Sequence, residues 1–334
     1  MLSSYAFIFA VLVRSISALK PAVIQLTEPV DHAEGPVWDS RTQLLYFVDI
    51  HSGKLNSFNI KTEEHRFIKL NGELAVAIPS EVNSSHFIVG LNRSVVAIEW
   101  DGGNRLKSTK TLSTVDEDKP TNRFNDGKAD KEGRLWFGTM GYENSKGVLD
   151  TNKGSLYFIT KQNLAHPEAI ISPVNISNGL AWNKANDRFY YIDTPTNQVK
   201  EYVYDNNSGR ISEPKIVFDV NTFSQYITGH PDGMTIDADD NLWIALYDGG
   251  AVVKVDPRKK QLSQIVPIPA QYTTSVCWGG EKYDILFVTT SRYTLNAEDR
   301  KRQSAAGSVF AVKGLDAVGL PSFKANIVSK AERM

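Results

Sequence analysis

One strand-like pattern recurs six times along this chain of 334 residues, and the repetition constrains the fold more than any other feature. Each copy is rich in aromatic and β-branched side chains, and successive copies begin about 40 to 55 residues apart. Most copies follow a polar turn and precede a second strand-like segment, whereas helical periodicity is nearly absent. The pattern predicts an all-β, six-bladed β-propeller, in which four-stranded blades surround a central channel. The six runs are LLYFVD (44–49), HFIVGL (86–91), RLWFGT (134–139), RFYYID (188–193), NLWIAL (241–246) and ILFVTT (285–290).

The domain organisation follows from the same repeats. Length alone would allow one or two domains. Because the repeats continue along the chain without a linker, we expect residues 19–334 to form one closed ring and a single domain. A two-sheet sandwich is the alternative, but it would not need six equivalent repeats.

The N-terminus resembles a secretory signal peptide over residues 1–18. The apolar run from Tyr5 to Val13 has the length of a signal-peptide core and is too short to span a bilayer. Small residues follow, and cleavage after Ala18 would fit them, although no basic residue precedes the run. We therefore expect secretion, with a cytoplasmic chain that begins in a strand as the alternative. Four glycosylation sequons, at Asn83, Asn92, Asn175 and Asn206, are compatible with secretion.

Composition excludes several classes of function. The chain has 38 acidic residues against 37 Lys plus Arg, so no basic excess indicates nucleic-acid binding. No apolar stretch predicts a membrane span. The single cysteine, Cys277, cannot form an internal disulfide, and its surroundings are typical of a buried strand rather than of a catalytic thiol. The G-x-S-x-G motif of serine hydrolases is absent. The oligomeric state stays open.

Four repeats carry a polar residue followed by glycine ahead of the aromatic run. In a propeller the chain enters each blade at its innermost strand, so equivalent positions there should surround the channel mouth. Glycine would let the backbone turn tightly beside a ligand. The alternative is that these dipeptides only form turns. The four pairs are Glu34-Gly35, Asp126-Gly127, Asn178-Gly179 and Asp232-Gly233.

The side chains of Glu34, Asn178 and Asp232 would offer a ligand only oxygen atoms. Such a set suits one hard divalent cation, Ca²⁺ first, with Mg²⁺ or Mn²⁺ as alternatives, and does not suit a tetrahedral structural zinc site. A bound cation with open positions could polarise a carbonyl group while a nearby carboxylate takes a proton from water. His230, two residues before Asp232, is expected at the rim, because Pro231 should interrupt the extended pairing between them.

At these residues the chain resembles the family of senescence marker protein (regucalcin), gluconolactonase and luciferin-regenerating enzyme. The motifs that carry the resemblance occur in the family's order along most of the chain. They are AEGPVWD (33–39), NRFNDGKAD (122–130), GRLWFGTM (133–140), GSLY (154–157), SNGLAW (177–182) and PDGMTID (231–237).

The resemblance implies a six-bladed propeller with a divalent metal in the channel, with Zn²⁺ as a further candidate metal. It implies that Glu34, Asn178 and Asp232 are the metal ligands and that Asp232 is also the general base. Arg123 and Asn125 match the pair that binds substrate oxygens. Glu143 matches a third substrate contact by spacing alone, since the second acid often found beside it in the family is missing.

Asp126 is in phase with the metal ligands by its Asp-Gly pair, whereas the family motif assigns the substrate role to Asn125. We keep Asp126 as a weaker metal or water contact. The expected activity is that of a metal-dependent lactonase, which hydrolyses a gluconolactone-like sugar lactone to the aldonic acid. Two alternatives stay open: a hydrolase of the luciferin-regenerating type, and a secreted calcium-binding propeller without turnover.

Overall fold

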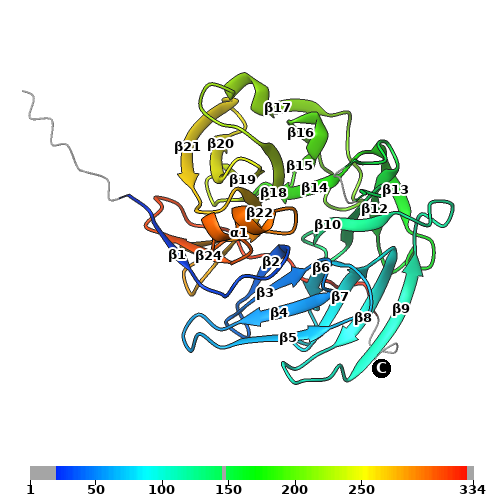
Figure 1. Ribbon diagram of the computed structural model, residues 1–334. Coiled ribbons are helices and arrows are strands. Elements are labelled where there is room, and N and C mark those ends of the chain that lie inside the picture. The colour runs from blue at the N-terminus through cyan, green and yellow to red at the C-terminus, as the bar shows by residue number, and fades with distance from the viewer. Residues whose placement is uncertain (1–19, 145–147, 329–334) are drawn as a thin grey trace, which may run out of the picture.

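The computed structural model describes residues 20–144 and 148–328, and six four-stranded antiparallel sheets surround a common axis in it (Figure 1). The six-bladed propeller predicted from the repeats is confirmed. The predicted signal peptide, residues 1–18, lies outside the described residues. Within the described ranges no helix has the length and apolar character needed to cross a membrane.

The first five blades follow the chain from the innermost strand outward. Blade 1 contains β2 (Ala33–Asp39), β3 (Leu44–Asp49), β4 (Lys54–Phe58) and β5 (His65–Lys69). Blade 2 contains β6 (Leu74–Pro79), β7 (His86–Leu91), β8 (Ser94–Glu99) and β9 (Ser108–Thr114). Blade 3 contains β10 (Arg123–Ala129), β11 (Leu135–Met140), β12 (Gly154–Ile159) and β13 (Glu168–Val174). Blade 4 contains β14 (Ser177–Trp182), β15 (Arg188–Asp193), β16 (Gln198–Val203) and β17 (Lys215–Asp219). Blade 5 contains β18 (His230–Ile236), β19 (Leu242–Tyr247), β20 (Ala251–Asp256) and β21 (Gln261–Pro267).

The sixth blade joins the two ends of the chain and closes the ring. It contains β22 (Tyr272–Gly279), β23 (Ile285–Ser291), β24 (Phe310–Lys313) and, at its outer edge, β1 (Ala22–Gln25) from the start of the propeller. The repeats did not predict β1, because its partner strand lies at the other end of the propeller, with Ala22 opposite Lys313. The connection between β23 and β24 holds the short helix α1 (Ala297–Arg302), and 3-10 turns follow β15 (Thr194–Thr196) and β17 (Val220–Phe223).

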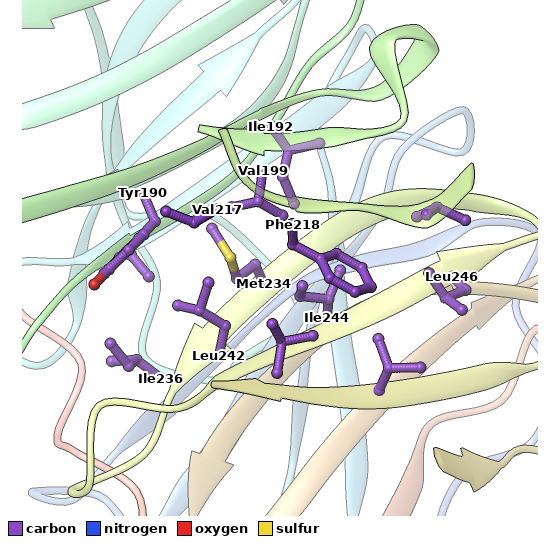
Figure 2. Packing of buried hydrophobic residues seen from close by; sticks show 14 of the residues in the cluster. Tyr190, Ile192, Val199, Val217, Phe218, Met234, Ile236, Leu242, Ile244 and Leu246 are labelled. Carbon is purple, nitrogen blue, oxygen red and sulfur yellow. The ribbon is translucent and has the colours of Figure 1, made fainter. Parts of the chain in front are cut away.

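The core lies between neighbouring blades. Where blades 4 and 5 pack together, apolar side chains from both sheets form a buried cluster, which Figure 2 shows. Burial of apolar surface stabilises such a contact by about 25 cal/mol per Å². The aromatic residues of the six runs supply much of this burial, which explains why the repeat is visible in the sequence. Labelled members of the cluster are Tyr190, Ile192, Val199, Val217 and Phe218 from blade 4, and Met234, Ile236, Leu242, Ile244 and Leu246 from blade 5.

Each innermost strand has a β-bulge in its first half. The register with the next strand shifts there in all six blades, for example between Pro231 and Met234 in β18. A bulge bends the strand and re-aims the side chains at the extra residue. In β18, Asp232 and Gly233 together face the single residue Ala245 of β19, so the bulge decides where the Asp232 carboxylate points.

Gly233→Ala should lower the free energy of unfolding by about 1–3 kcal/mol. A Cβ atom at this position would lie 2.4 Å from Ser275 Cβ and 2.7 Å from Ser275 Cα, so the backbone of the next blade would have to move. Urea denaturation measures the change. Gly103→Ala is the control, because a Cβ there meets only the rotatable Asp101 carboxylate, at 3.1 Å. Equal free energies of unfolding in both variants would show that β18 and β22 can move apart at this point without loss of stability.

Candidate active site at the channel mouth

The strand register identifies one equivalent residue in each blade. The third residue of each repeat run pairs with a residue of the innermost strand, such as Tyr46 with Val37 or Trp243 with Thr235. The position three residues before that partner lies at the bulge of every blade. We call these residues the axial ring. They are Glu34, Ala75, Asn125, Asn178, Asp232 and Thr274.

This register corrects the alignment of Asp126 with the metal ligands. Asn125 occupies the axial ring, because Trp136 pairs with Lys128, and Asp126 follows one position later, where Gly233 stands in blade 5. The error arose because the Asp-Gly pair in β10 is displaced by one residue from the corresponding pairs. Asp126 is nevertheless buried, and its charge raises the pKa of Glu34 and of Asp232, so it also lies near the axis.

Side chains of the axial ring hydrogen-bond to the backbone of the following blade. Asn125 Nδ2 donates to the Ser177 carbonyl oxygen at 3.0 Å, directly before Asn178. Thr274 Oγ1 donates to the Ala33 carbonyl oxygen at 2.6 Å, directly before Glu34. These bonds fasten neighbouring blades at the ring and fix the backbone from which the next ring side chain projects.

The third connection runs through Thr194, which follows β15. Asn178 Nδ2 donates to Thr194 Oγ1 at 2.9 Å, and Thr194 Oγ1 donates to the Pro231 carbonyl oxygen, also at 2.9 Å. Thr194 therefore fixes the orientation of the Asn178 amide and anchors the strand directly before Asp232. Threonine hydroxyls at such positions leave no local pattern in the sequence, so neither Thr194 nor Thr274 was predicted.

The carboxylates at the axis are buried close to one another. Glu34 is 4% exposed and Asp232 is 6% exposed. Burial raises the pKa of both groups well above their usual values, and mutual repulsion with Asp126 adds to the rise. The Gly35 N–H, which donates to Glu34 Oε2 at 2.6 Å, offsets part of this rise for Glu34, and a hydrogen bond from Asn178 does so for Asp232. The nearby Arg123 charge lowers both pKa values as well. The ring thus concentrates negative charge that its own cations do not balance.

The amide oxygen of Asn178 also lacks a partner. Asn178 Oδ1 is buried without a hydrogen bond, as is Asp126 Oδ2, although buried polar atoms are nearly always paired. Across the described ranges no three His, Cys, Asp or Glu side chains are placed to hold a metal together, so a cation here would need the Asn178 oxygen as a ligand. Two repelling carboxylates and a free amide oxygen fit a hard divalent cation at Glu34, Asn178 and Asp232.

Arg123 lies beside the axial ring. Its Nη1 donates to the Phe124 carbonyl oxygen and to Asn125 Oδ1, each at 2.9 Å, and its Nε is 3.9 Å from Glu73 Oε1. The Arg123 side chain is only 13% exposed, which excludes a surface-loop arginine. Burial lowers its pKa, and the charges of Glu73 and Glu143 raise it. Arg123 and Asn125 are therefore placed together, as the family motif implied.

Two further acids, Glu143 and Glu73, lie near enough to Arg123 for their charges to raise its pKa. Glu143 is exposed, and its charge reaches both Arg123 and Tyr247, where it contributes to a raised pKa of the tyrosine. Glu73 was not predicted; its Oε1 is 2.8 Å from Nδ1 of His51, and this contact lowers the pKa of Glu73. Glu73 lies in a loop between two blades and belongs to no motif, so its position near Arg123 could not be predicted from the sequence.

His230 and Cys277 lie as the sequence predicts, apart from one detail. His230 is exposed, and its Nδ1 is 2.6 Å from Asn197 Oδ1 at the rim. Pro231 does not interrupt the strand, since it pairs with Leu246 within β18. The regular pairing is interrupted only at the bulge that follows, between Pro231 and Met234. Cys277 is 2% exposed, and burial raises the pKa of its thiol to about 12, so the sulfur is not a nucleophile.

Comparison with known proteins places this chain among a defined group of propellers. Residues 32–292 match the model of the "SMP-30/Gluconolactonase/LRE-like region". Regucalcin from Macaca fascicularis is 35% identical over 290 residues, which cover 87% of this chain and 93% of the relative. The crystal structure of a luciferin-regenerating enzyme superposes with a TM-score of 0.85 at 32% identity and covers 91% of this chain and 99% of that one. A regucalcin from Agrobacterium tumefaciens superposes with a TM-score of 0.81 at 21% identity, over 92% of this chain and 98% of its own, which supports the fold. The chain is therefore a member of the SMP-30/gluconolactonase/LRE-like family.

Proposed function

We propose that this protein is a metal-dependent lactonase that opens a sugar lactone of the gluconolactone kind. The observation that carries the proposal is the axial ring, in which the unpaired Asn178 oxygen lies among buried, mutually repelling carboxylates. A family that includes gluconolactonases supports the same chemistry. Glu34, Asn178 and Asp232 would hold one divalent cation. When bound, the cation supplies a positive charge that polarises the lactone carbonyl.

Asp232 is the proposed general base. Its carboxylate would take a proton from a water molecule as that water attacks the lactone carbonyl carbon. Burial raises the pKa of Asp232, which strengthens the ionised group as a proton acceptor. The ring C–O bond then breaks and the ring oxygen takes up the proton that Asp232 accepted. The product carries this hydroxyl group and a carboxylic acid, which ionises to the carboxylate. The bulge and the Thr194 anchor would hold Asp232 in place during this transfer.

Arg123 and Asn125 would orient the substrate. The Arg123 guanidinium presents several N–H donors in one plane, which suits a substrate with several oxygen atoms. Asn125 already engages Arg123 and the Ser177 carbonyl, so its amide is held in one orientation. Glu143, exposed at the mouth, would contact a substrate hydroxyl group.

A matrix of metals and lactones tests the proposal. Purified protein freed of metal is assayed with Ca²⁺, Mn²⁺, Mg²⁺ or Zn²⁺ against five- and six-membered aldonolactones and an unsubstituted lactone. We expect turnover that depends on the cation and favours hydroxylated lactones. Equal rates with and without metal would contradict the proposal.

The likeness to the luciferin-regenerating enzyme favours a second candidate function. That enzyme is 32% identical and shares the fold over nearly its whole length. This reading keeps the axial ring but replaces the lactone by a nitrile or a thiazoline-related compound. Adding such compounds to the assay separates the two functions.

A calcium-binding propeller without turnover is the third candidate. The Agrobacterium tumefaciens relative is described as a calcium-binding protein. If cations raise the melting temperature but no lactone or thiazoline is consumed, binding is the function and Asp232 acts only as a ligand.

Thr194→Val should weaken cation binding by about tenfold, the lower end of the range for residues that orient metal ligands. Valine keeps the shape of threonine but removes the hydroxyl group, so Asn178 Nδ2 loses its acceptor and the amide is free to rotate. Isothermal titration with Ca²⁺ measures the affinity. Thr194→Ser is the matched control, since it keeps the hydroxyl group and should bind as the natural protein does. An unchanged affinity in Thr194→Val would show that Thr194 does not position the amide.

A further inference from the structure

A cavity lies in the channel next to the axial ring. It is partly open, has a volume of about 330 Å³, and is lined by the later residues of the innermost strands. Because each innermost strand leads away from the ring toward the opposite face, the cavity opens at the other end of the channel. Apolar side chains, among them Val37, Ile78 and Ile236, form much of its wall.

The C-terminal segment 318–326 crosses this end of the channel. At one side the Ala238 N–H donates to the Val318 carbonyl oxygen at 2.8 Å, next to blade 5. At the other side the Asn326 N–H donates to the Gly133 carbonyl oxygen at 2.8 Å, in blade 3. Between these anchors, residues 320–323 line the cavity. The segment therefore narrows the opening and adds apolar wall to it.

Two lysines mark the opening. Lys131 and Lys184 both line the cavity and are exposed, and within the described part of the chain neither forms an ion pair. Asp240 lies close to Lys184 but accepts a hydrogen bond from its backbone N–H, at 2.7 Å. This end of the cavity thus offers two cations without an ion-pair partner.

The end of the cavity next to the axial ring, in contrast, offers no free positive charge. Lys128 donates a hydrogen bond to the Met234 carbonyl oxygen and faces Asp126, so its charge is already engaged. Above it stand the carboxylates of the axial ring. An anionic group would be repelled there and attracted at the opening, whereas an apolar chain would fit the walls between the two ends.

We propose that this cavity binds an amphipathic monocarboxylate, with its apolar chain along the innermost strands and its carboxylate at Lys131 and Lys184. A largely apolar pocket with a few convergent polar groups is the usual form of a small-molecule site, and 330 Å³ lies at the lower end of the usual range. The site is distinct from the lactone site, because no residue of the axial ring lines the cavity.

Calorimetric titration with sodium dodecanoate, below its micelle threshold, tests the proposal. We expect one molecule to bind per chain, more tightly than dodecanol and much more tightly than dodecyltrimethylammonium. The double variant Lys131→Glu/Lys184→Glu should lose roughly tenfold in affinity, as expected for two exposed ion pairs converted to repulsion. Lys69→Glu is the control, because it makes this charge change at one lysine on an outer strand away from the cavity.

Thr235→Phe tests the location. Thr235 lines the cavity and is half-buried, so a larger side chain there would occupy the volume that the apolar chain needs. We expect this variant to bind dodecanoate at least tenfold more weakly at an unchanged melting temperature. Asp232→Asn should bind dodecanoate like the natural protein, so failure of the lactonase proposal leaves this one intact. No binding, or equal affinity for the three amphiphiles, would overturn it, as would unchanged affinity in both cavity variants.

Discussion

Asp232→Asn should reduce kcat for lactone hydrolysis by about 10³-fold, within the usual range for loss of a positioned general base. Asparagine has nearly the same shape, so the β18 bulge and the packing of Gly233 against Ser275 are retained. The amide, however, cannot accept a proton from water. Steady-state kinetics on the best lactone of the matrix, with saturating cation, measures the loss.

Asp126→Asn is the matched control for Asp232→Asn. It makes the same chemical change on a carboxyl group that is equally buried and electrostatically linked to Asp232, but that lies one residue out of phase with the axial ring. We expect a smaller loss of kcat in this variant. Full activity in Asp232→Asn would refute the assignment of the base, and equal losses in both variants would show that total negative charge matters rather than proton transfer at Asp232.

The six blades could be predicted because their second strands pack between sheets. Burial from both sides selects aromatic and branched residues such as Tyr46 and Trp243, and these recur at the same position of each run. The strand β1, in contrast, could not be predicted. It lies at an exposed outer edge, pairs with β24 at the other end of the propeller, and leaves a pattern too weak to identify.

A position of the axial ring could be predicted from the sequence when its residue is polar and a glycine follows directly. This condition holds for Glu34, Asn178 and Asp232, but blades 2 and 6 have Ala75 and Thr274, which no local motif marks. The hydrogen bonds between blades could not be predicted, because they depend on which carbonyl of the next blade faces a side chain. Strand register, rather than residue type, identifies all six positions.

The metal-free protein should lose stability as the pH rises from about 5 to 8, and a divalent cation should restore it. Burial raises the pKa values of Glu34 and Asp232 above their unfolded values of about 4. In this window the folded chain binds more protons than the unfolded chain, so the free energy of unfolding falls with pH. Melting curves of the metal-free protein across this range measure the effect.

The cation reverses the trend, because it binds the ionised carboxylates of the folded state. At one hundred times its dissociation constant it should add about 2.7 kcal/mol to the free energy of unfolding. Protons compete for the same oxygens, so the gain in melting temperature on adding Ca²⁺ should be small at pH 5 and large at pH 8. Glu34→Gln is the matched control: it removes one of the repelling charges, so its metal-free form should depend less on pH and gain less from Ca²⁺. The opposite result would be a metal-free protein whose stability rises over this range and does not respond to any divalent cation. It would mean that Arg123 and Lys128 alone balance the axial carboxylates and that the ring holds no metal.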